Sequence, residues 1–473
     1  MATFPAQGHV NPSVHFSIQL VALGCRVILV TTVSGSYLIT KSNNILPPGL
    51  SIVTFSDGYD MAGSSWKSKE DQNKQWEQLN SRGSQFLSDL IVTNANQGTP
   101  FACLVYSPLL TWAVDVARDH NLPTTLLWIQ PATVMDIYYY LFNGYGDLFE
   151  KCKDPSFAMD LPGLHSVSFT SKDLPSFAIH PNQYPLLING VKQQMQVLTR
   201  DGTKSKVLVN TFDELEMEAM KANVELEMIG VGPLIPSCFW EPRHDNNNTD
   251  GGDSVVTWLD LQARSSVVYV SFGTMAVISK KQREELAKGL VSSSNRPFLW
   301  VIRKDEAVEK EEERIEMVRW REEMETKAES VGGRIIEWCS QVEVLSHEAV
   351  GCFVTHCGWN STLESICLGV PLVAFPQFSD QTTNAKLVED VWKIGVRVVV
   401  PNQKPETEEE EAAVVVEGDE IRRCLDLVMG EGQVREQVTT NADKWKQLAR
   451  DALREGGSSH SNIKAFVDQI IGK

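Results

Sequence analysis

A short apolar run followed by a glycine-containing turn gives this chain a segment suited to holding phosphate. The strand-like run 351–355 leads into His356, then a turn containing Gly358, and then a helix that Asn360 and Ser361 open. The free N–H groups and the positive dipole end of such a helix face an anion. We therefore expect a phosphate-bearing ligand at the start of this helix.

Ser361 and Glu364 allow two interpretations. Their S-x-x-E spacing is that of a capping box, so helix capping alone accounts for the pair. Alternatively, Glu364 lies one turn into the helix and accepts hydrogen bonds from both ribose hydroxyls of a nucleotide, as acidic residues do in other nucleotide folds. The spacing does not separate the two interpretations.

Trp338 and Gln341 extend the candidate site toward a nucleobase. A lone Trp at the end of a strand-like run, here 334–338, is usually a core residue. With Gln341 three residues further on, the ring can instead stack on a base that the amide hydrogen-bonds.

Asp380 and Gln381 come just after an apolar strand, 371–375, where the carboxyl ends of parallel strands hold ligands. Alternatively, Asp380 only caps the helix expected from about Thr382.

The whole run from Trp338 to Gln381 resembles the signature box of plant secondary-product UDP-glycosyltransferases, and the resemblance extends from Phe4 to Gly472. It implies an inverting enzyme of GT-B fold that uses a UDP-sugar with no metal and no cofactor. Asp380 and Gln381 would hold the sugar hydroxyls, and Gln as the last box residue implies UDP-glucose. Phe378 stands where the family more often has Trp. The implied donor-binding residues are Thr274, Trp338, Cys339, Gln341, His356, Trp359, Asn360, Ser361, Glu364, Asp380 and Gln381.

The segment TFPAQGHVNPSVHF places His9 in a turn before a helix that we expect to begin near Asn11 or Pro12. A loop histidine is usually a polar surface residue. The match to the family's P-x-Q-G-H-x-x-P pattern favours instead a general base that takes a proton from the acceptor as its oxygen attacks the sugar. A single displacement of this kind converts an α-linked donor into a β-glucoside.

Most relatives pair this histidine with an Asp, and the family pattern places Ser107 at that position. Asp115 lies eight residues too late and is interpreted as an exposed helical residue. Without the carboxylate the histidine should be less basic, which suits an acidic acceptor such as a phenol or a carboxylic acid.

The segments FSDGYD, PATVMDIYYYLFNGY and KVLVNTFDELE are most similar to anthocyanin 5-O-glucosyltransferases and crocetin-type enzymes that form glucose esters. We expect a flavonoid or anthocyanin hydroxyl as acceptor, with a carboxylic acid of crocetin, auxin or abscisic-acid type as the alternative. A weakened nucleotide-sugar binder and a sugar-nucleotide epimerase are hypotheses of other classes. The candidate acceptor residues, which core packing would explain equally well, are Trp128, Gln130, Tyr138, Tyr139, Phe142 and Phe378.

Alternating strand-like and helix-like runs predict two doubly wound parallel α/β sheets. We expect an N-terminal acceptor domain (1–236) whose first strand is truncated, a polar linker (237–253), a donor domain (254–440), and terminal helices (441–473) that pack back on the first domain. The predicted strands are 26–33, 51–55, 102–107, 124–130, 266–272, 297–303, 334–338, 352–356, 371–375 and 395–400.

Composition limits the function classes. With 43 Lys and Arg against 61 Asp and Glu, the net charge of −18 argues against nucleic acid or an anionic membrane as partner. Nine cysteines without a C-x-x-C pair indicate neither a zinc site nor a disulfide framework. No apolar stretch is long enough to span a membrane. We expect a cytoplasmic, monomeric protein that binds a UDP-sugar and a small apolar or aromatic acceptor.

Overall fold

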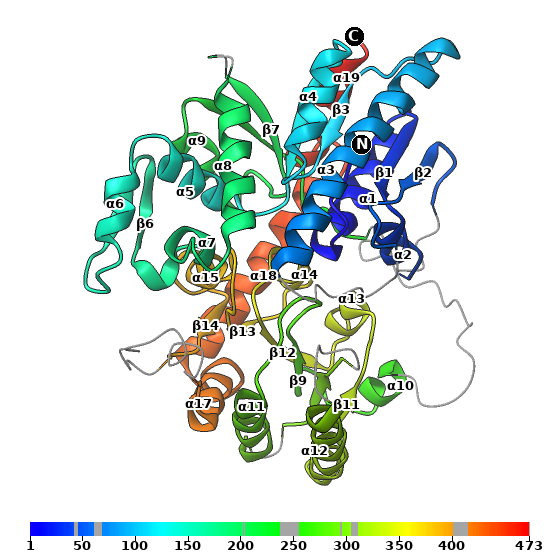
Figure 1. Cartoon of the computed structure of the whole chain (residues 1–473). Coiled ribbons are helices and arrows are strands. Elements are labelled where there is room, and N and C mark those ends of the chain that lie inside the picture. The colour runs from blue at the N-terminus through cyan, green and yellow to red at the C-terminus, as the bar shows by residue number, and fades with distance from the viewer. Residues whose placement is uncertain are drawn as a thin grey trace. The chain divides into compact units, whose positions relative to one another are not determined.

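The computed structural model describes residues 1–41, 46–60, 69–200, 202, 204–236, 255–293, 296–303, 311–400 and 415–472. The chain divides into two compact units, one formed by Met1–Pro236 with Leu448–Lys473 and one by Ser237–Gln447. The predicted linker, 237–253, lies outside the described residues. Each unit is a parallel sheet with helices packed on it (Figure 1).

The sheet of the first unit is continuous through a single residue. Ala2 forms parallel bridges to Val30 and to Tyr106, so it joins the pair β1-β2 to the four strands ordered β3-β4-β7-β8. The predicted first strand is thus represented in the ladder by Ala2 alone. The strands are β1 (Val27–Thr32), β2 (Leu50–Phe55), β3 (Leu104–Tyr106), β4 (Thr124–Trp128), β7 (Ser205–Val209) and β8 (Leu226–Gly230), with a separate antiparallel hairpin of β5 (Met159–Leu161) and β6 (Leu164–Phe169).

Apolar residues of the first and last helices form much of this unit's core. Val10, Val14 and Phe16 of α1 are buried, and the Phe16 ring centroid lies 6.3 Å from that of Phe466 in α19. The helices are α1 (Gln7–Ala22), α2 (Val33–Lys41), α3 (Lys69–Asn96), α4 (Thr111–Asp119), α5 (Ala132–Phe142), α6 (Gly146–Lys151), α7 (Ser176–Ile179), α8 (Pro185–Thr199), α9 (Ala219–Ala222) and α19 (Ser458–Ile470), with a 3₁₀ turn η1 (Ser171–Asp173).

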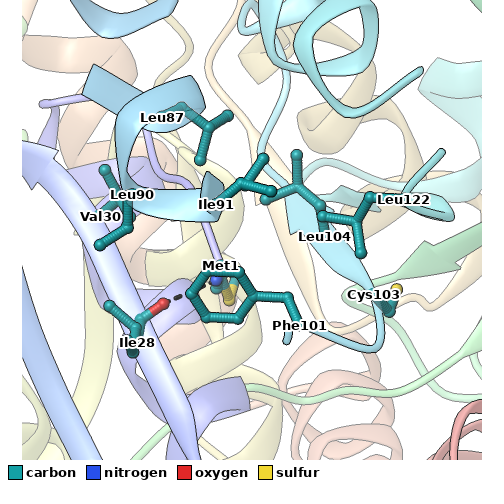
Figure 2. A pocket seen from close by; sticks show the side chains of 10 residues that line it. All are labelled: Met1, Ile28, Val30, Leu87, Leu90, Ile91, Phe101, Cys103, Leu104 and Leu122. Carbon is teal, nitrogen blue, oxygen red and sulfur yellow. Dashed lines mark hydrogen bonds between the residues drawn. The ribbon is translucent and has the colours of Figure 1, made fainter. Parts of the chain in front are cut away.

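A small apolar pocket lies between β1 and α3 in the first unit (Figure 2). The amino group of Met1 donates to Ile28 O at 2.7 Å, and burial lowers the pKa of this amine to about 6. None of the described candidate site residues lines the pocket, so we assign it no role in chemistry. Its lining residues are Met1, Ile28, Val30, Leu87, Leu90, Ile91, Phe101, Cys103, Leu104 and Leu122.

The second unit is a six-stranded parallel sheet in the order β11-β10-β9-β12-β13-β14. The central strands β9 and β12 are almost entirely buried, as expected where helices cover both faces of a sheet. The strands are β9 (Val267–Ser271), β10 (Phe298–Val301), β11 (Arg334–Ile336), β12 (Val350–Thr355), β13 (Leu372–Ala374) and β14 (Gly395–Arg397). The helices are α10 (Val255–Asp260), α11 (Lys280–Ser292), α12 (Glu311–Ser330), α13 (Gln341–Leu345), α14 (Trp359–Leu368), α15 (Gln381–Lys386), the π-helix η3 (Leu387–Val391) and α17 (Gly418–Met429), and α18 (Gln433–Leu453) ends in the first unit.

Every predicted strand has a counterpart within a few residues, and the GT-B class of two parallel α/β sheets is confirmed. The strands that the sequence did not predict are β5, β6, β7 and β8. Only Val207–Val209 of β7 form an uninterrupted apolar run, and β8 alternates buried with half-buried residues, so neither strand stands out from its flanks.

Candidate functional site

The predicted donor residues follow the carboxyl ends of neighbouring strands in the second unit. Trp338 follows β11, Thr274 follows β9, His356 follows β12, and Asp380 with Gln381 follows β13. These strands are parallel neighbours, separated only by β10, so their carboxyl ends lie along one edge of the sheet. The topology therefore gathers residues as far apart in sequence as Thr274 and Gln381, more than a hundred positions.

The helix after β12 begins without a side-chain cap. Its N-cap is Gly358, which supplies no side-chain oxygen, and its first residue is Trp359. Ser361 is therefore the third helical residue, and the capping-box interpretation of Ser361 with Glu364 is wrong. A helix start without a side-chain cap is a ready anion site.

Ser361 and Glu364 instead share a hydrogen-bonding partner. The Nε2 atom of Gln341 donates to Ser361 Oγ at 2.9 Å and to Glu364 Oε2 at 2.7 Å. Burial raises the pKa of Glu364 to about 7, although the hydrogen bond from Gln341 acts in the opposite direction. The three side chains form a polar cluster of the kind that can receive ribose hydroxyls.

Tyr269, on β9, completes this cluster and was missed by the sequence analysis. Its hydroxyl lies 3.4 Å from Cys339 Sγ and donates to Gln341 Oε1 at 3.5 Å, while its ring stacks on Phe353 with centroids 4.9 Å apart. Burial raises the pKa of Cys339 to about 11, so the thiol remains protonated at neutral pH. A single tyrosine within an apolar strand carries no sequence signal for such a role.

Trp338 is 47 % exposed, beside Cys339. The core interpretation of this tryptophan is therefore wrong. A half-exposed ring at the carboxyl end of β11 suits stacking on a flat ligand.

His356 packs against the loop that follows β9. A Cβ atom on Gly273 would lie 2.7 Å from both Cε1 and Nε2 of the imidazole, so glycine is required for this approach. Burial and, second, the positive charge of Arg303 lower the pKa of His356 to about 4. The imidazole is therefore neutral near pH 7, and it acts toward an anion as a hydrogen-bond donor only.

Asp380 and Gln381 are held by contacts within the second unit. Asp380 makes no side-chain cap of α15, and its Oδ2 accepts from Asn384 Nδ2 at 2.7 Å. Gln381 Oε1 accepts from the backbone N–H groups of Gln377 at 2.9 Å and Phe378 at 3.1 Å. The amide of Gln381 thus has a fixed orientation, with its NH₂ group turned away from these donors.

His9 lies within the first turn of α1, so the predicted turn and the helix start near Asn11 or Pro12 are wrong. The carbonyl of Ala6 accepts from the N–H groups of His9 and Val10, which starts the helix at Gln7. Pro12 suggested a first helical position, but it sits inside the helix. The hydrogen bond from the His9 N–H to Ala6 O, 2.8 Å long, nevertheless fixes the backbone of His9.

Ser107 is brought beside His9, with Ser107 Oγ 3.3 Å from His9 Nδ1. The same Oγ accepts from the N–H of Phe4 at 2.9 Å, which uses one of its two lone pairs. The other lone pair can accept from Nδ1–H, and that tautomer leaves Nε2 able to take a proton. A hydroxyl carries no charge to stabilise the imidazolium, and burial lowers the pKa of His9 to about 3. The exposed-residue interpretation of Asp115 is confirmed, since it pairs with two arginines on the surface of the unit.

The candidate acceptor residues are divided between core and partly exposed positions. Trp128 and Tyr138 are fully buried and pack edge to face, with the Trp128 Nε1 donating to Pro131 O at 3.0 Å. Both belong to the core of the first unit, and Phe378 packs on the core of the second. Those with partly exposed side chains are Gln130, Tyr139 and Phe142.

The segment KVLVNTFDELE has an architectural role. Glu216 accepts from the N–H groups of Ala132 and Thr133 at 2.9 and 3.0 Å, and so caps α5 from 84 residues away. Asn210 Oδ1 accepts from Leu234 N at 2.8 Å. These contacts fasten the loop after β7 to the rest of the unit.

Within the described ranges, no group of three or more His, Cys, Asp or Glu residues is placed to hold a metal ion. None of the helices that the structure describes is long and apolar enough to cross a membrane.

Comparison with known proteins gives consistent matches. A model of the family described as UDP-glucoronosyl and UDP-glucosyl transferase matches residues 192–409. The chain is 48 % identical to phloretin 4'-O-glucosyltransferase of Malus domestica, over 99 % of this chain and 97 % of that one. It is 45 % identical to the chloroplastic crocetin glucosyltransferase of Gardenia jasminoides, over 99 % and 96 %. The crystal structure of Os79 from O. sativa, in complex with U2F and trichothecene, superposes with a TM-score of 0.80 at 31 % identity, over 99 % of this chain and 100 % of that one.

Proposed function

The chain belongs to the UDP-glucuronosyl and UDP-glucosyl transferase family, and from this membership we propose that it transfers glucose from UDP-glucose to a hydroxyl of a flavonoid- or anthocyanin-type metabolite, with inversion. The cluster of Gln341, Ser361 and Glu364 beside the start of α14 carries the proposal. It places ribose acceptors next to an anion site, which is the arrangement a nucleoside diphosphate needs.

Different donor-site residues would bind different parts of UDP-glucose. Trp338 stacks on uracil, Glu364 accepts from the ribose hydroxyls, and the start of α14 with neutral His356 donates to the diphosphate. Asp380 and Gln381 bind the glucose hydroxyls. The NH₂ group of Gln381, left available by its two backbone contacts, suits an oxygen of the sugar.

The reaction requires a proton acceptor and a stabilised leaving group. As the acceptor oxygen bonds to C1 of glucose, its proton passes to Nε2 of His9, and the bond from C1 to the UDP oxygen breaks with both electrons leaving on UDP. Attack opposite the leaving group gives the β-glucoside. We also propose that helix dipole and hydrogen-bond donors offset the diphosphate charge without a metal, so chelation with EDTA should leave the rate unchanged.

Glucose-ester formation on a carboxylic acid is the second candidate, and the His9–Ser107 pair supports it. A base whose pKa is about 3 gives little driving force for deprotonating a phenol, whereas a carboxylic acid is already ionised at neutral pH. One of the relatives above is a crocetin glucosyltransferase.

A panel of phenols and carboxylic acids, assayed for UDP release, tests the proposal and separates the candidates. An ester product hydrolyses in alkali and a phenolic glucoside resists. His9→Ala should abolish transfer to hydroxyls and spare an ionised carboxylate, so equal loss on both acceptor types would count against the general-base role. Binding of UDP-glucose without any turnover would indicate a nucleotide-sugar binder, and isomerised UDP-sugar an epimerase.

A further inference from the structure

Arg303 holds the loop that leads from β9 into the donor site. It follows β10, the strand paired with β9, and its guanidinium donates from Nη2 to Ala276 O at 2.7 Å and from Nη1 to Thr274 O. Two donations from one planar group fix the backbone between these carbonyls. Thr274 is one of the residues expected to contact the donor.

The same loop contacts His356. Gly273 approaches the imidazole so closely that an added Cβ would overlap it, and the charge of Arg303 contributes to the low pKa of His356. Arg303, the Gly273–Ala276 loop and His356 therefore form one cluster, immediately before the start of α14. The cluster lies within the second unit.

Arg303 carries the positive charge that acts on His356. The chain carries a net charge of −18, so its overall field repels a diphosphate. His356, with its pKa of about 4, is uncharged near pH 7. An arginine stays protonated under all these conditions, and a fixed charge in a partly buried place is screened less than one on the surface.

We propose that Arg303 is a positioning residue for the donor's diphosphate, which holds the Thr274 loop against His356 and supplies the positive field at the phosphates. The inference rests on the proposed function, because it assumes that a UDP-sugar occupies this site. Arg303 would act in two ways: through its positive charge, which Lys can replace, and through its two parallel N–H donations to the loop, which Lys cannot reproduce.

Binding of UDP and of uridine to the intact chain, measured by calorimetry, tests the proposal. Arg303→Gln should weaken UDP binding by about tenfold or more, the effect of losing one charged interaction, and should leave uridine binding within about twofold. Arg303→Lys should recover part of the UDP affinity. Arg296, which flanks the other end of β10 and donates to Asp426 Oδ1 at 2.6 Å, gives the matched control Arg296→Gln, with unchanged binding of both ligands.

The pKa of His356 gives a second, spectroscopic test of the same proposal. The His356 imidazole, followed by NMR, should show a higher pKa in Arg303→Gln than in the wild-type chain, and no change in Arg296→Gln. Wild-type UDP affinity in Arg303→Gln would overturn the inference, as would equal losses of UDP and uridine, which indicate a loop that serves folding alone. Failure of the wild-type chain to bind UDP at all would instead overturn the proposed function.

Discussion

The pH dependence of donor binding tests the assignment of Glu364 to the ribose. Burial raises the pKa of this carboxyl to about 7, so in the free protein it is about half neutral at that pH. Ribose hydroxyls donate to a carboxylate, and a protonated carboxyl offers them fewer lone pairs. UDP-glucose should therefore bind more tightly as the pH rises through 7, and binding near neutrality should release protons.

The size of the effect follows from the pKa. At pH 6 about a tenth of the free Glu364 is ionised, so the dissociation constant of UDP-glucose should be about tenfold larger than at pH 8. UDP-glucose is the suitable ligand because both of its phosphates stay fully ionised over this range. His356 titrates far below it, near 4. Calorimetry in buffers of different ionisation enthalpy measures both the affinity and the protons released.

Glu364→Gln provides the control, since it keeps the shape of the side chain and removes the titration. Its affinity should be low and independent of pH. A flat profile for the wild-type chain, or a tenfold change that persists in Glu364→Gln, would refute the reasoning.

Three further substitutions follow from the geometry. Ser107→Asp should raise the low pKa of His9 by about 1–3 units and so move the acidic limb of the pH profile of kcat/KM for a phenol to higher pH. Ser107→Asn should leave that limb in place, and identical pH profiles for the two variants would contradict the pairing of His9 with residue 107. Gly273→Ala should lower the free energy of unfolding by about 1–3 kcal/mol and weaken UDP binding, as measured by thermal shift and by calorimetry. Gly98 is also at positive φ but has open space around its Cβ, so Gly98→Ala should lose stability only through backbone strain and should bind UDP normally. Gln381→His should lower the ratio of rates with UDP-glucose and UDP-galactose, and an unchanged ratio would rule out this role.

Local pattern was enough to predict most of the framework. The strands of the second unit are apolar runs bounded by polar segments, and they appear where the pattern places them. The start of α1 was misplaced because Pro12 favours a first helical position, while the actual N-cap residue is Ala6, which makes no side-chain cap and so has no sequence signature.

Ser361 and Glu364 show why spacing left a choice open. Residues three apart lie on one face of a helix whether or not they form a capping box. The decision came from Gly358, which takes the cap position, and from Gln341, which approaches that face from another element. Tertiary contacts of this kind cannot be predicted from the sequence of either segment alone.

Arg303 could not be identified from sequence for a related reason. Its partners, the carbonyls of Thr274 and Ala276, lie 29 and 27 positions away on the loop of a neighbouring strand, and backbone carbonyls are the same in every residue type. The sequence likewise could not decide whether Trp128 and Tyr138 lie in the core or in a binding site, since aromatic clusters occur in both.

The most direct test of the account is NMR of the sugar products formed from UDP-glucose with and without an acceptor. UDP should be released only when a phenol or carboxylic acid is present, with one β-linked glucoside formed for each UDP. UDP-glucose that binds but is never consumed across the acceptor panel, or an α-linked product, would contradict it.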